Sequence, residues 1–348
     1  MRARRLARSA LAERSASLVD VTRQVCGIHA QVQASAELQL AARVDGIVQQ
    51  DVRDALWRDR TLVKAWTLRG TLHLHPAGEL PMWLATRSPR EGLPEWPDPA
   101  GVVHAAVTVE EVAELRAAVW EAASGEPMLR EELVAEVVRN VGRKHEPRLR
   151  SGFAFFTDDL CQGPPLGNKI TLVRPDLWVG KWNHVERNDA RREILRRFLY
   201  AYGPARPSEF RAWSGSDVPF EDVEEVDVEG RRAFVLAGDT EFPELQKSVR
   251  LLPEYDVYVM GFRERDQLVP PRVREEVAAH GRGRYEGPAG VRFLLADGVA
   301  AGLWERRKTA KRLELSTVPA ARVNRAALSR EAARYAEFLG VELELRVG

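Results

Sequence analysis

Helical segments followed by a pair of short strands recur along this chain, and that order restricts the folds open to it. In residues 1–88 the apolar spacing predicts three helices. Alternating β-branched and aromatic residues on both sides of Arg69-Gly70 then predict two strands. Three helices followed by a β-hairpin is the order of a winged helix, so we predict one over residues 1–88.

The same order restarts after residues 89–99, a proline-rich segment that cannot be a continuous helix. Thr108-Val-Glu-Glu predicts a capped helix to about Ala122. Further helices are predicted at 129–141 and 148–160, with a second wing after Cys161. We therefore predict a second winged helix over residues 100–180, and a third, beginning near Asp189, over residues 185–248.

Residues 249–348 are predicted to be rich in β-structure. Strands are expected over 251–262, 291–296, 299–304 and 313–317, with a hairpin turn at Asp297-Gly298. A helix over about 320–339 and a last strand from Val341 complete the segment. The predicted fold class is α+β, with three tandem winged-helix domains and a β-rich C-terminal element.

The charge balance excludes a uniformly basic protein. The 348 residues contain 52 Lys and Arg against 51 Asp and Glu, a formal net charge of +1. Local basic runs remain, and the densest comprises Arg306, Arg307, Lys308 and Lys311 beside a predicted hairpin. Such runs are usually solvated faces, but gathered on one surface they would contact nucleic-acid phosphates.

The cysteine content and the lack of long apolar runs indicate the compartment. Cys26 and Cys161 are too few for a disulfide framework. The basic N-terminus is not followed by the apolar run of a secretory signal, and no run of about eighteen apolar residues occurs. We predict a cytoplasmic protein without a membrane segment.

Uncharged polar residues interrupt the apolar first helix at Cys26-Gly-Ile-His29-Ala30-Gln31-Val-Gln33. On a regular helix His29 and Gln31 would face different sides, so they converge only if the helix ends or distorts there. The spacing alone favours capping of the helix ends by these side chains. A catalytic pair is the alternative.

No metal or cofactor site is predicted. His73 and His75 share one face of the first wing, and Cys26-x-x-His29 resembles half of a zinc site, but neither pair has further ligands at a suitable spacing. The glycine-rich run beginning at Gly281 lacks the Gly-Lys-Ser/Thr of a phosphate loop.

Five segments carry a resemblance to a known family. They are Gly27-Ile-His29-Ala30-Gln31 with the run to Arg43, Trp66-Thr-Leu-Arg69-Gly70-Thr71-Leu-His73, Leu251-Leu-Pro-Glu-Tyr-Asp256, Gly261-Phe-Arg263-Glu-Arg265, and Asp297-Gly298 to Trp304. Together they resemble the AlkZ/YcaQ-like winged-helix DNA glycosylases. The likeness spans nearly the whole chain in the family's order. It implies three winged helices and a β-rich element arranged as a C around duplex DNA.

The family's catalytic motif is Gln, an apolar residue, then Gln or Asp. It maps onto His29, Ala30 and Gln31, with His in place of the commoner Gln; a slipped register would instead use Gln31 and Gln33. With Gln31 as its last residue, the motif resembles that of the family branch that confers antibiotic self-resistance. The resemblance also implies that Thr71 and His73 lie near the catalytic helix or the DNA backbone. The alternative is that the wing packs on its own domain. Arg69 is expected to bind DNA.

These residue types suit hydrolysis of a cationic N7-alkylguanine, whose glycosidic bond is already weak. The enzyme must hold a water at C1′ of the sugar and stabilise an oxocarbenium-like transition state. A glutamine carbonyl can orient that water, and a neutral histidine, with a usual pKa of about 6.5, can accept its proton. No lysine lies near the motif to form a Schiff base, which favours a monofunctional glycosylase.

We therefore predict a monomeric DNA glycosylase that acts on double-stranded DNA carrying bulky alkyl adducts or interstrand crosslinks. Its role would be DNA repair or self-resistance to a DNA-alkylating natural product. Two alternatives remain: a winged-helix transcriptional regulator, and a pseudo-enzyme that binds adducts without excising them.

Overall fold

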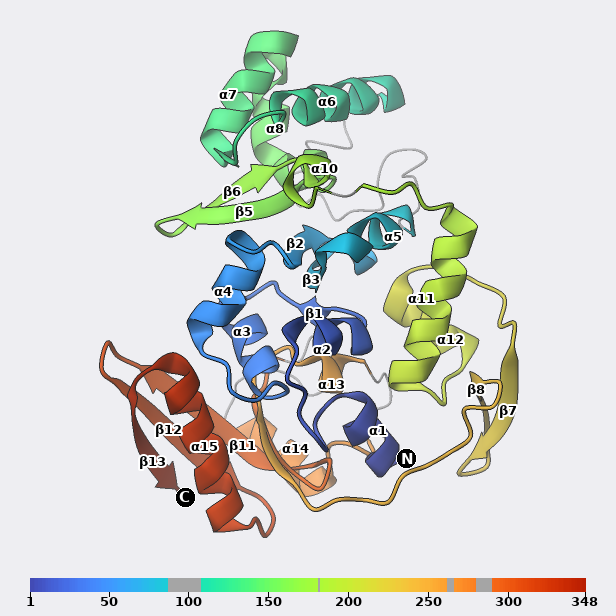
Figure 1. The fold of residues 1–348 in the computed structure, drawn as a ribbon, viewed down its shortest axis with the longest axis vertical. Helices are drawn as coiled ribbons and strands as arrows, with labels where there is room; N and C mark the ends of the chain where they lie inside the picture. The colour runs from blue at the N-terminus through green and yellow to red at the C-terminus, as the bar shows by residue number, and fades with distance from the viewer. Residues whose placement is uncertain (87–107, 181, 262–265, 280–289) are drawn as a thin grey trace. The chain divides into compact units, whose positions relative to one another are not determined.

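The computed structural model describes residues 1–86, 108–180, 182–261, 266–279 and 290–348. These residues form a mixed α/β protein with two compact units (Figure 1). One unit combines Met1–Asp54 with Arg192–Gly348, and the other is Ala55–Arg191. The predicted first winged helix thus contributes chain to both units. Three features of the sequence lie outside the described residues: the proline-rich segment 89–99, Arg263 with Arg265, and the glycine-rich run from Gly281.

The unit Ala55–Arg191 contains two of the predicted hairpins. Strand β2 (Leu62–Trp66) pairs antiparallel with β3 (Leu72–Pro76), and β5 (Cys161–Leu166) pairs antiparallel with β6 (Lys169–Val173). Strands β2 and β5 also pair, so the strands run in the order β3-β2-β5-β6-β4. Both predicted hairpins are confirmed.

The helices of this unit surround a core of buried aliphatic and aromatic side chains, which include Leu115, Leu133 and Phe156. The predicted capping box is present: Thr108 Oγ1 accepts a bond from Glu111 N at 3.2 Å. The helix predicted over 148–160 is wrong in extent, because Gly152 separates two short helices. The remaining elements are η1 (Leu68–Gly70), η2 (Ala77–Glu79), α5 (Leu80–Ala85), α6 (Val109–Ala122), β4 (Met128–Leu129), α7 (Arg130–Val141), η3 (Arg143–His145), α8 (Glu146–Ser151), α9 (Phe153–Phe156) and α10 (Pro175–Trp178).

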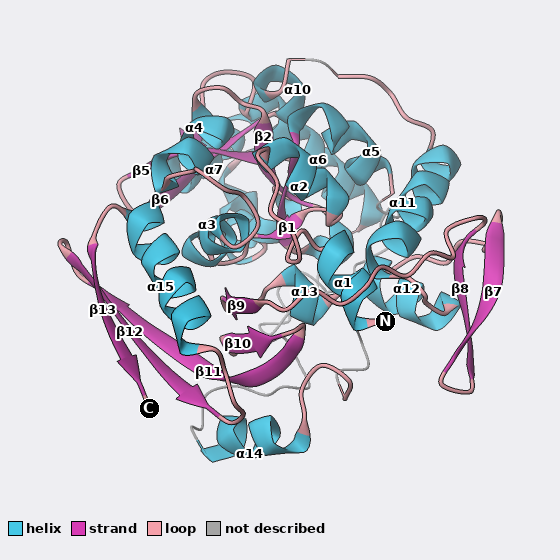
Figure 2. Cartoon of the chain, turned by 60° about the horizontal axis from the view of Figure 1, so that its bottom comes forward, coloured by secondary structure: helices cyan, strands magenta, loops and turns pink. Residues whose placement is uncertain are grey.

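The other unit is built on a five-stranded sheet in the order β13-β12-β11-β10-β9. Neighbouring strands are antiparallel except for β12 and β13. Helix α15 packs along the sheet (Figure 2), against β9, β12 and β13. Asp297 and Gly298 both have positive φ, 51° and 80°, which confirms the predicted hairpin turn. The strands are β9 (Val249–Leu252), β10 (Phe293–Ala296), β11 (Val299–Lys308), β12 (Arg312–Pro319) and β13 (Glu342–Val347).

Two predictions for this sheet are wrong in their bounds. The strand predicted over 251–262 ends at Leu252, and a short helix, α13 (Val257–Met260), follows. Pro253 lacks the N–H that a continuing strand would need, and Asp256 caps the helix by accepting a bond from Tyr258 N at 2.8 Å. The last helix begins at Arg325 rather than Ala320, because Asn324 caps it.

The rest of this unit comes from both ends of the chain. Within residues 185–248, where a third winged helix is predicted, β7 and β8 form an antiparallel hairpin. Helix α1 was not predicted from the sequence. Its residue Arg4 is buried and forms an ion pair with Asp239 at 2.6 Å. The elements are α1 (Arg2–Arg8), α2 (Leu18–Gln24), β1 (Ile28–His29), α3 (Gln33–Ala41), α4 (Gln49–Trp57), α11 (Arg187–Tyr202), α12 (Pro207–Ser214), β7 (Val223–Val228), β8 (Arg231–Leu236) and α14 (Pro271–Ala279). Helices α4 and α11 continue across the boundary between the units.

None of the described helices combines the length and the apolar character needed to cross a membrane.

Candidate active site

The candidate catalytic motif lies between α2 and α3, outside any helix: His29 ends the short strand β1, and Gln31 lies at a bend. The sequence pattern predicted that the first helix continues through His29, but α2 ends at Gln24. Cys26 and Gly27 have φ values of 60° and 94°, which a right-handed helix cannot contain. Two such residues in succession turn the chain, so His29 lies in strand β1.

This change of backbone matters for how His29 and Gln31 can act together. On a regular helix the two side chains would face different sides, but the chain is strand at His29 and bends at Gln31, so this restriction does not apply to them. The cap positions on either side of the motif are occupied by Val25 and Val32. Neither His29 nor Gln31 therefore stands where the capping interpretation requires it.

The motif changes from buried to exposed within three residues. His29 is 7% exposed and Ala30 is fully buried. Gln31 and Val32, the next two residues, are exposed. A largely buried histidine thus stands two residues before an exposed glutamine.

The backbone of the motif is held by a buried amide on helix α3. Gln39 Nε2 donates to the carbonyl oxygen of His29 at 3.0 Å, and Gln39 Oε1 accepts from Val257 N at 3.2 Å. The Gln39 side chain is fully buried. It therefore connects strand β1 to the start of α13, more than 200 residues later in the chain.

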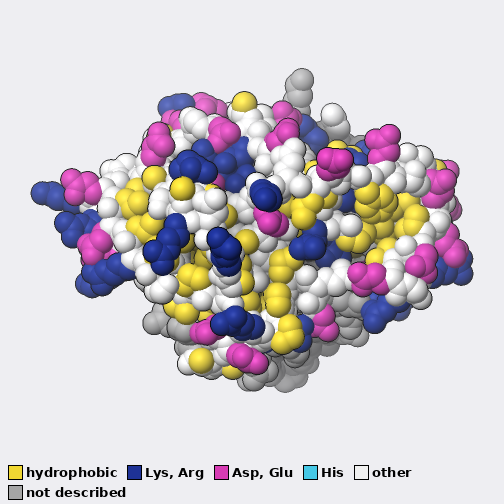
Figure 3. Space-filling view, turned by 90° about the horizontal axis from the view of Figure 1, so that it is seen from below, with side chains coloured by type: hydrophobic (Ala, Val, Ile, Leu, Met, Phe, Trp, Pro, Cys, Tyr) yellow, Lys and Arg dark blue, Asp and Glu magenta, His cyan; other side chains and the backbone are white. Residues whose placement is uncertain are grey.

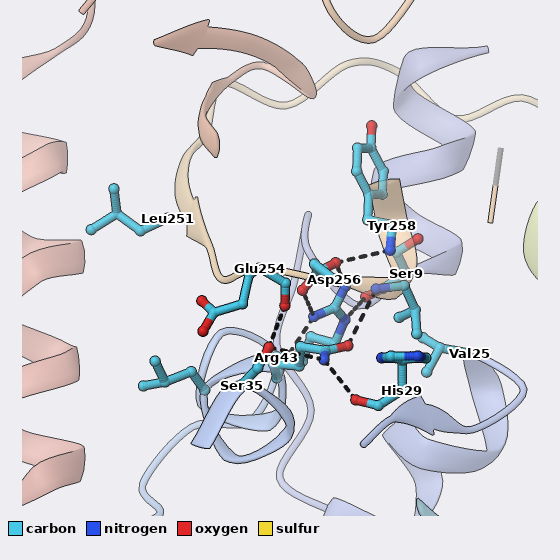
Figure 4. A network of polar contacts seen from close by, with 12 residues as sticks. Ser9, Val25, His29, Ser35, Arg43, Leu251, Glu254, Asp256 and Tyr258 are labelled. Carbon is cyan, nitrogen blue, oxygen red and sulfur yellow. Dashed lines mark hydrogen bonds and ion pairs between the residues drawn. The ribbon is translucent and has the colours of Figure 1, made fainter. Parts of the chain in front are cut away.

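Beside the motif lies a fully buried ion pair between Arg43 and Asp256 (Figure 4). The two carboxylate oxygens accept bonds from Arg43 Nη1 and Nη2 at 2.8 and 2.7 Å. Burial by itself would lower the pKa of Arg43, but the adjacent Asp256 carboxylate outweighs burial and raises it. Arg43 also donates to the carbonyl oxygens of Ser9 and Gln39, at 3.0 and 2.9 Å. A charge pair buried to this depth is stable only with such complete hydrogen bonding.

Gln33, the residue used by the slipped register, has a different environment. It is the first residue of α3, and its Nε2 lies 3.4 Å from Oε1 of the buried Glu37. Glu37 also accepts bonds from Gln49 Nε2 at 2.6 Å and from Arg53 Nε at 3.2 Å. The structure thus places Gln33 in helix α3 and in a polar cluster with α4, and not in the non-helical segment that carries His29 and Gln31.

Thr71, His73 and Arg69 belong to the other unit. His73 and His75 are buried, and Thr67 Oγ1 lies 3.1 Å from His73 Nδ1 and 2.9 Å from His75 Nε2. Thr71 follows the turn and its carbonyl oxygen is 3.0 Å from His73 Nδ1, while Arg69, with φ of 52°, is exposed at the turn. These contacts fit a wing packed within its own unit. Across the residues that the structure describes, no group of three or more His, Cys, Asp or Glu is placed to hold a metal ion.

The basic run at the β11–β12 hairpin divides into one partly buried residue and several exposed ones. The Arg306 side chain is 15% exposed and lies 4.0 Å from a Glu254 oxygen, and burial lowers its pKa. Arg307, Lys308 and Lys311 are exposed. The face drawn in Figure 3 carries side chains of both charges. Arg307, Lys308 and Lys311 are thus the cations of this run that are most accessible to phosphates, and a contact by Arg306 stays a prediction.

Sequence reasoning missed the residues that hold the motif in place. Gln39 and Ser35 were not singled out. A signal for them exists, because Ser35, Gln39 and Arg43 are polar residues spaced four apart, as on one face of a helix. Their partners lie more than 200 residues away and have no local signal.

Comparison with known proteins identifies the class. Residues 22–338 match the family described as DNA glycosylase AlkZ-like. The chain therefore belongs to the AlkZ-like DNA glycosylase family, and it is a DNA glycosylase, as the resemblance implied.

Two individual relatives support this assignment. The chain is 31% identical over 315 residues to the "Interstrand DNA cross-link repair glycosylase" of Streptomyces sahachiroi, a match that covers 83% of this chain and 82% of the relative. It also superposes on the solved structure of Streptomyces sahachiroi DNA glycosylase AlkZ with a TM-score of 0.80 and 29% identity. That match covers 100% of this chain and 98% of the other. The α/β fold is thus shared along the whole chain.

Proposed function

We propose that this glycosylase hydrolyses the N-glycosidic bond of bulky N7-alkylguanine adducts or of guanines in interstrand crosslinks, with His29 and Gln31 as its catalytic residues. The observation that carries the proposal is the motif itself, in which a buried histidine with a held carbonyl is followed two residues later by an exposed glutamine. The relative named for interstrand crosslink repair supports the substrate class. Repair or self-resistance against a DNA-alkylating natural product is the corresponding role.

The proposed chemistry divides the work between the two side chains. Gln31 Oε1 would accept a hydrogen bond from the attacking water and orient it towards C1′. His29 would accept the water's proton as the bond to the cationic base breaks. The oxygen then forms the bond to C1′, and the electrons of the glycosidic bond leave with the guanine, which becomes neutral. The first lysine of the chain is Lys64, so no amine near the motif in sequence is available for a lyase reaction.

A direct assay tests this proposal. We expect the protein to release the base from a duplex with one N7-alkylguanine, which leaves an alkali-labile abasic site at that position. The matched duplex with unmodified guanine is the control and should remain uncut. Binding of the adduct without release would instead support a pseudo-enzyme, and sequence-selective binding of undamaged DNA would support a regulator.

Several finer features remain predictions. They are the three winged helices arranged as a C around DNA, double-stranded rather than single-stranded DNA as the partner, a monomeric state and a cytoplasmic location. Three hairpins, β2–β3, β5–β6 and β7–β8, each follow helical segments, which supports the repeated winged-helix pattern. Thr71 and His73 as a secondary site, and Arg69 as a DNA contact, also stay predictions.

The exposed cations of the β11–β12 hairpin are expected to contact DNA phosphates. We predict that replacing Arg307, Lys308 and Lys311 together by Ala weakens duplex binding. The magnitude of the slope of the log binding constant against log salt concentration should fall by about two to three, because each lost phosphate contact removes about 0.9 from it. Binding titrations from low to moderate salt measure this slope. The matched control replaces three other exposed arginines of the same unit, Arg322, Arg325 and Arg330. An equal effect in both triple variants would show that net charge, and not the hairpin, matters.

A further inference from the structure

The turn between β9 and α13 brings the ring of Tyr255 against the imidazole of His29. The two ring centroids are 5.6 Å apart and the ring planes are tilted by 35°. Tyr255 is partly exposed, whereas Glu254 and Asp256 on either side are buried. The contact joins residues 226 positions apart in the sequence, so only the folded chain makes it.

The backbone of Tyr255 is held in a conformation that its side chain disfavours. Its φ is 61°, in the left-handed region that glycine and asparagine adopt readily and bulky residues rarely adopt. Among the non-glycine residues with positive φ that the structure describes, Tyr255 is the only aromatic one. Such a conformation costs free energy and persists only where the surrounding structure enforces it.

Two side chains of α3, and Arg43 two residues beyond its end, provide that enforcement. Ser35 donates to the carbonyl oxygen of Glu254, Gln39 accepts from Val257 N at 3.2 Å, and Arg43 pairs with Asp256. These three residues, spaced four apart in the sequence, form a polar stripe along α3 and the turn that follows it. The stripe fixes the chain immediately before and after Tyr255.

The same stripe also fixes the chain at His29. Gln39 donates to the His29 carbonyl oxygen at 3.0 Å while it accepts from Val257 N. One buried amide therefore sets the distance between strand β1 and the turn that carries Tyr255. Figure 4 shows His29, Ser35, Arg43, Glu254 and Asp256 together in this network.

From this arrangement we infer that Tyr255 is a positioning residue for His29, which it holds in one orientation by ring contact. The inference rests on the catalytic role proposed above for His29. A fixed imidazole loses less rotational freedom when it engages the attacking water, so the contact contributes to the rate of base release and not to DNA affinity.

Two substitutions at Tyr255 separate the ring from the backbone. Tyr255→Asn removes the ring but suits the left-handed conformation, and Tyr255→Phe keeps the ring and removes only the hydroxyl. We expect Tyr255→Asn to lower the single-turnover rate of base release about tenfold with duplex affinity unchanged, and Tyr255→Phe to restore a rate near that of the wild type. Wild-type rates in Tyr255→Asn, or equal losses in both variants, would overturn the inference.

A measurement that does not depend on activity keeps this test distinct from that of the proposed function. The chain has seven histidines, so the imidazole proton resonances of His29 can be assigned by their loss in His29→Ala. The ring current of Tyr255 should shift them, and Tyr255→Asn should move them while Tyr255→Phe leaves them in place. Unmoved resonances in Tyr255→Asn would refute the ring contact. If the resonances and the rate respond as expected at Tyr255 but His29→Ala keeps its rate, the proposed role of His29 fails instead.

Discussion

His29→Ala and Gln31→Ala are each expected to slow base release by at least about 100-fold, the range in which positioned proton acceptors contribute. His29→Ala removes the acceptor for the proton of the attacking water, and Gln31→Ala removes the carbonyl that orients this water. Because Gln31 is exposed, its truncation should leave the free energy of unfolding nearly unchanged. Single-turnover cleavage of the adduct duplex, with thermal unfolding of each variant, measures both effects.

The matched control for these variants is Gln33→Ala. Gln33 lies in α3 beside Glu37, outside the non-helical segment that carries His29 and Gln31, so its loss should leave the rate close to that of the wild type. A large loss in Gln33→Ala together with an active His29→Ala would favour the slipped register. His29→Gln restores the residue commoner at this position in the family and should retain measurable release. Near wild-type rates in both His29→Ala and Gln31→Ala would exclude the proposed site.

Breaking the buried ion pair is expected to have the largest effect on stability. Asp256→Asn leaves the Arg43 charge fully buried without its carboxylate, and such losses cost about 3–5 kcal/mol in the free energy of unfolding. The Asp256 side chain also caps α13, which adds to the effect. Urea denaturation of the wild type and of Asp256→Asn measures the difference.

Two comparisons show whether the charge itself is responsible. The double variant Arg43→Leu/Asp256→Leu removes both charges and should recover part of the lost stability, because no unpaired charge remains. Asp20→Asn breaks an exposed ion pair of the same unit, Arg23 with Asp20, and should cost at most about 1 kcal/mol. A cost for Asp256→Asn no larger than that for Asp20→Asn would show that the buried pair contributes little to stability.

Elements with strong local signals were predicted well from the sequence. The capping box at Thr108 and the Asp297-Gly298 turn depend on side chains within a few residues of each other, and both are present. The hairpin around Arg69-Gly70 follows from strict alternation of residue types and is also confirmed. The strand predicted through Tyr255 fails, because an apolar run does not by itself distinguish a strand from a turn that enters a helix.

The motif shows where local patterns stop being sufficient. Its residues were named from the sequence, but the spacing of Val21, Val25 and Ile28 fits a helix that the structure ends at Gln24. The positive φ at Cys26 is not encoded by a glycine or an asparagine there, so no local rule predicts it. Tertiary packing therefore decided the backbone on which the proposed chemistry depends.

By itself, the sequence determined the order of elements, the family and the identity of the candidate residues, because each follows from neighbours in the chain or from motifs kept in order. Only the tertiary structure decided what surrounds them. Gln39, Arg43 and Asp256 meet at the motif because the sheet of residues 249–348 packs against α3 through α15 and the start of α13. Hydrogen bonds and charge pairs between residues more than 200 positions apart carry no periodicity, so no reading of local pattern can find them.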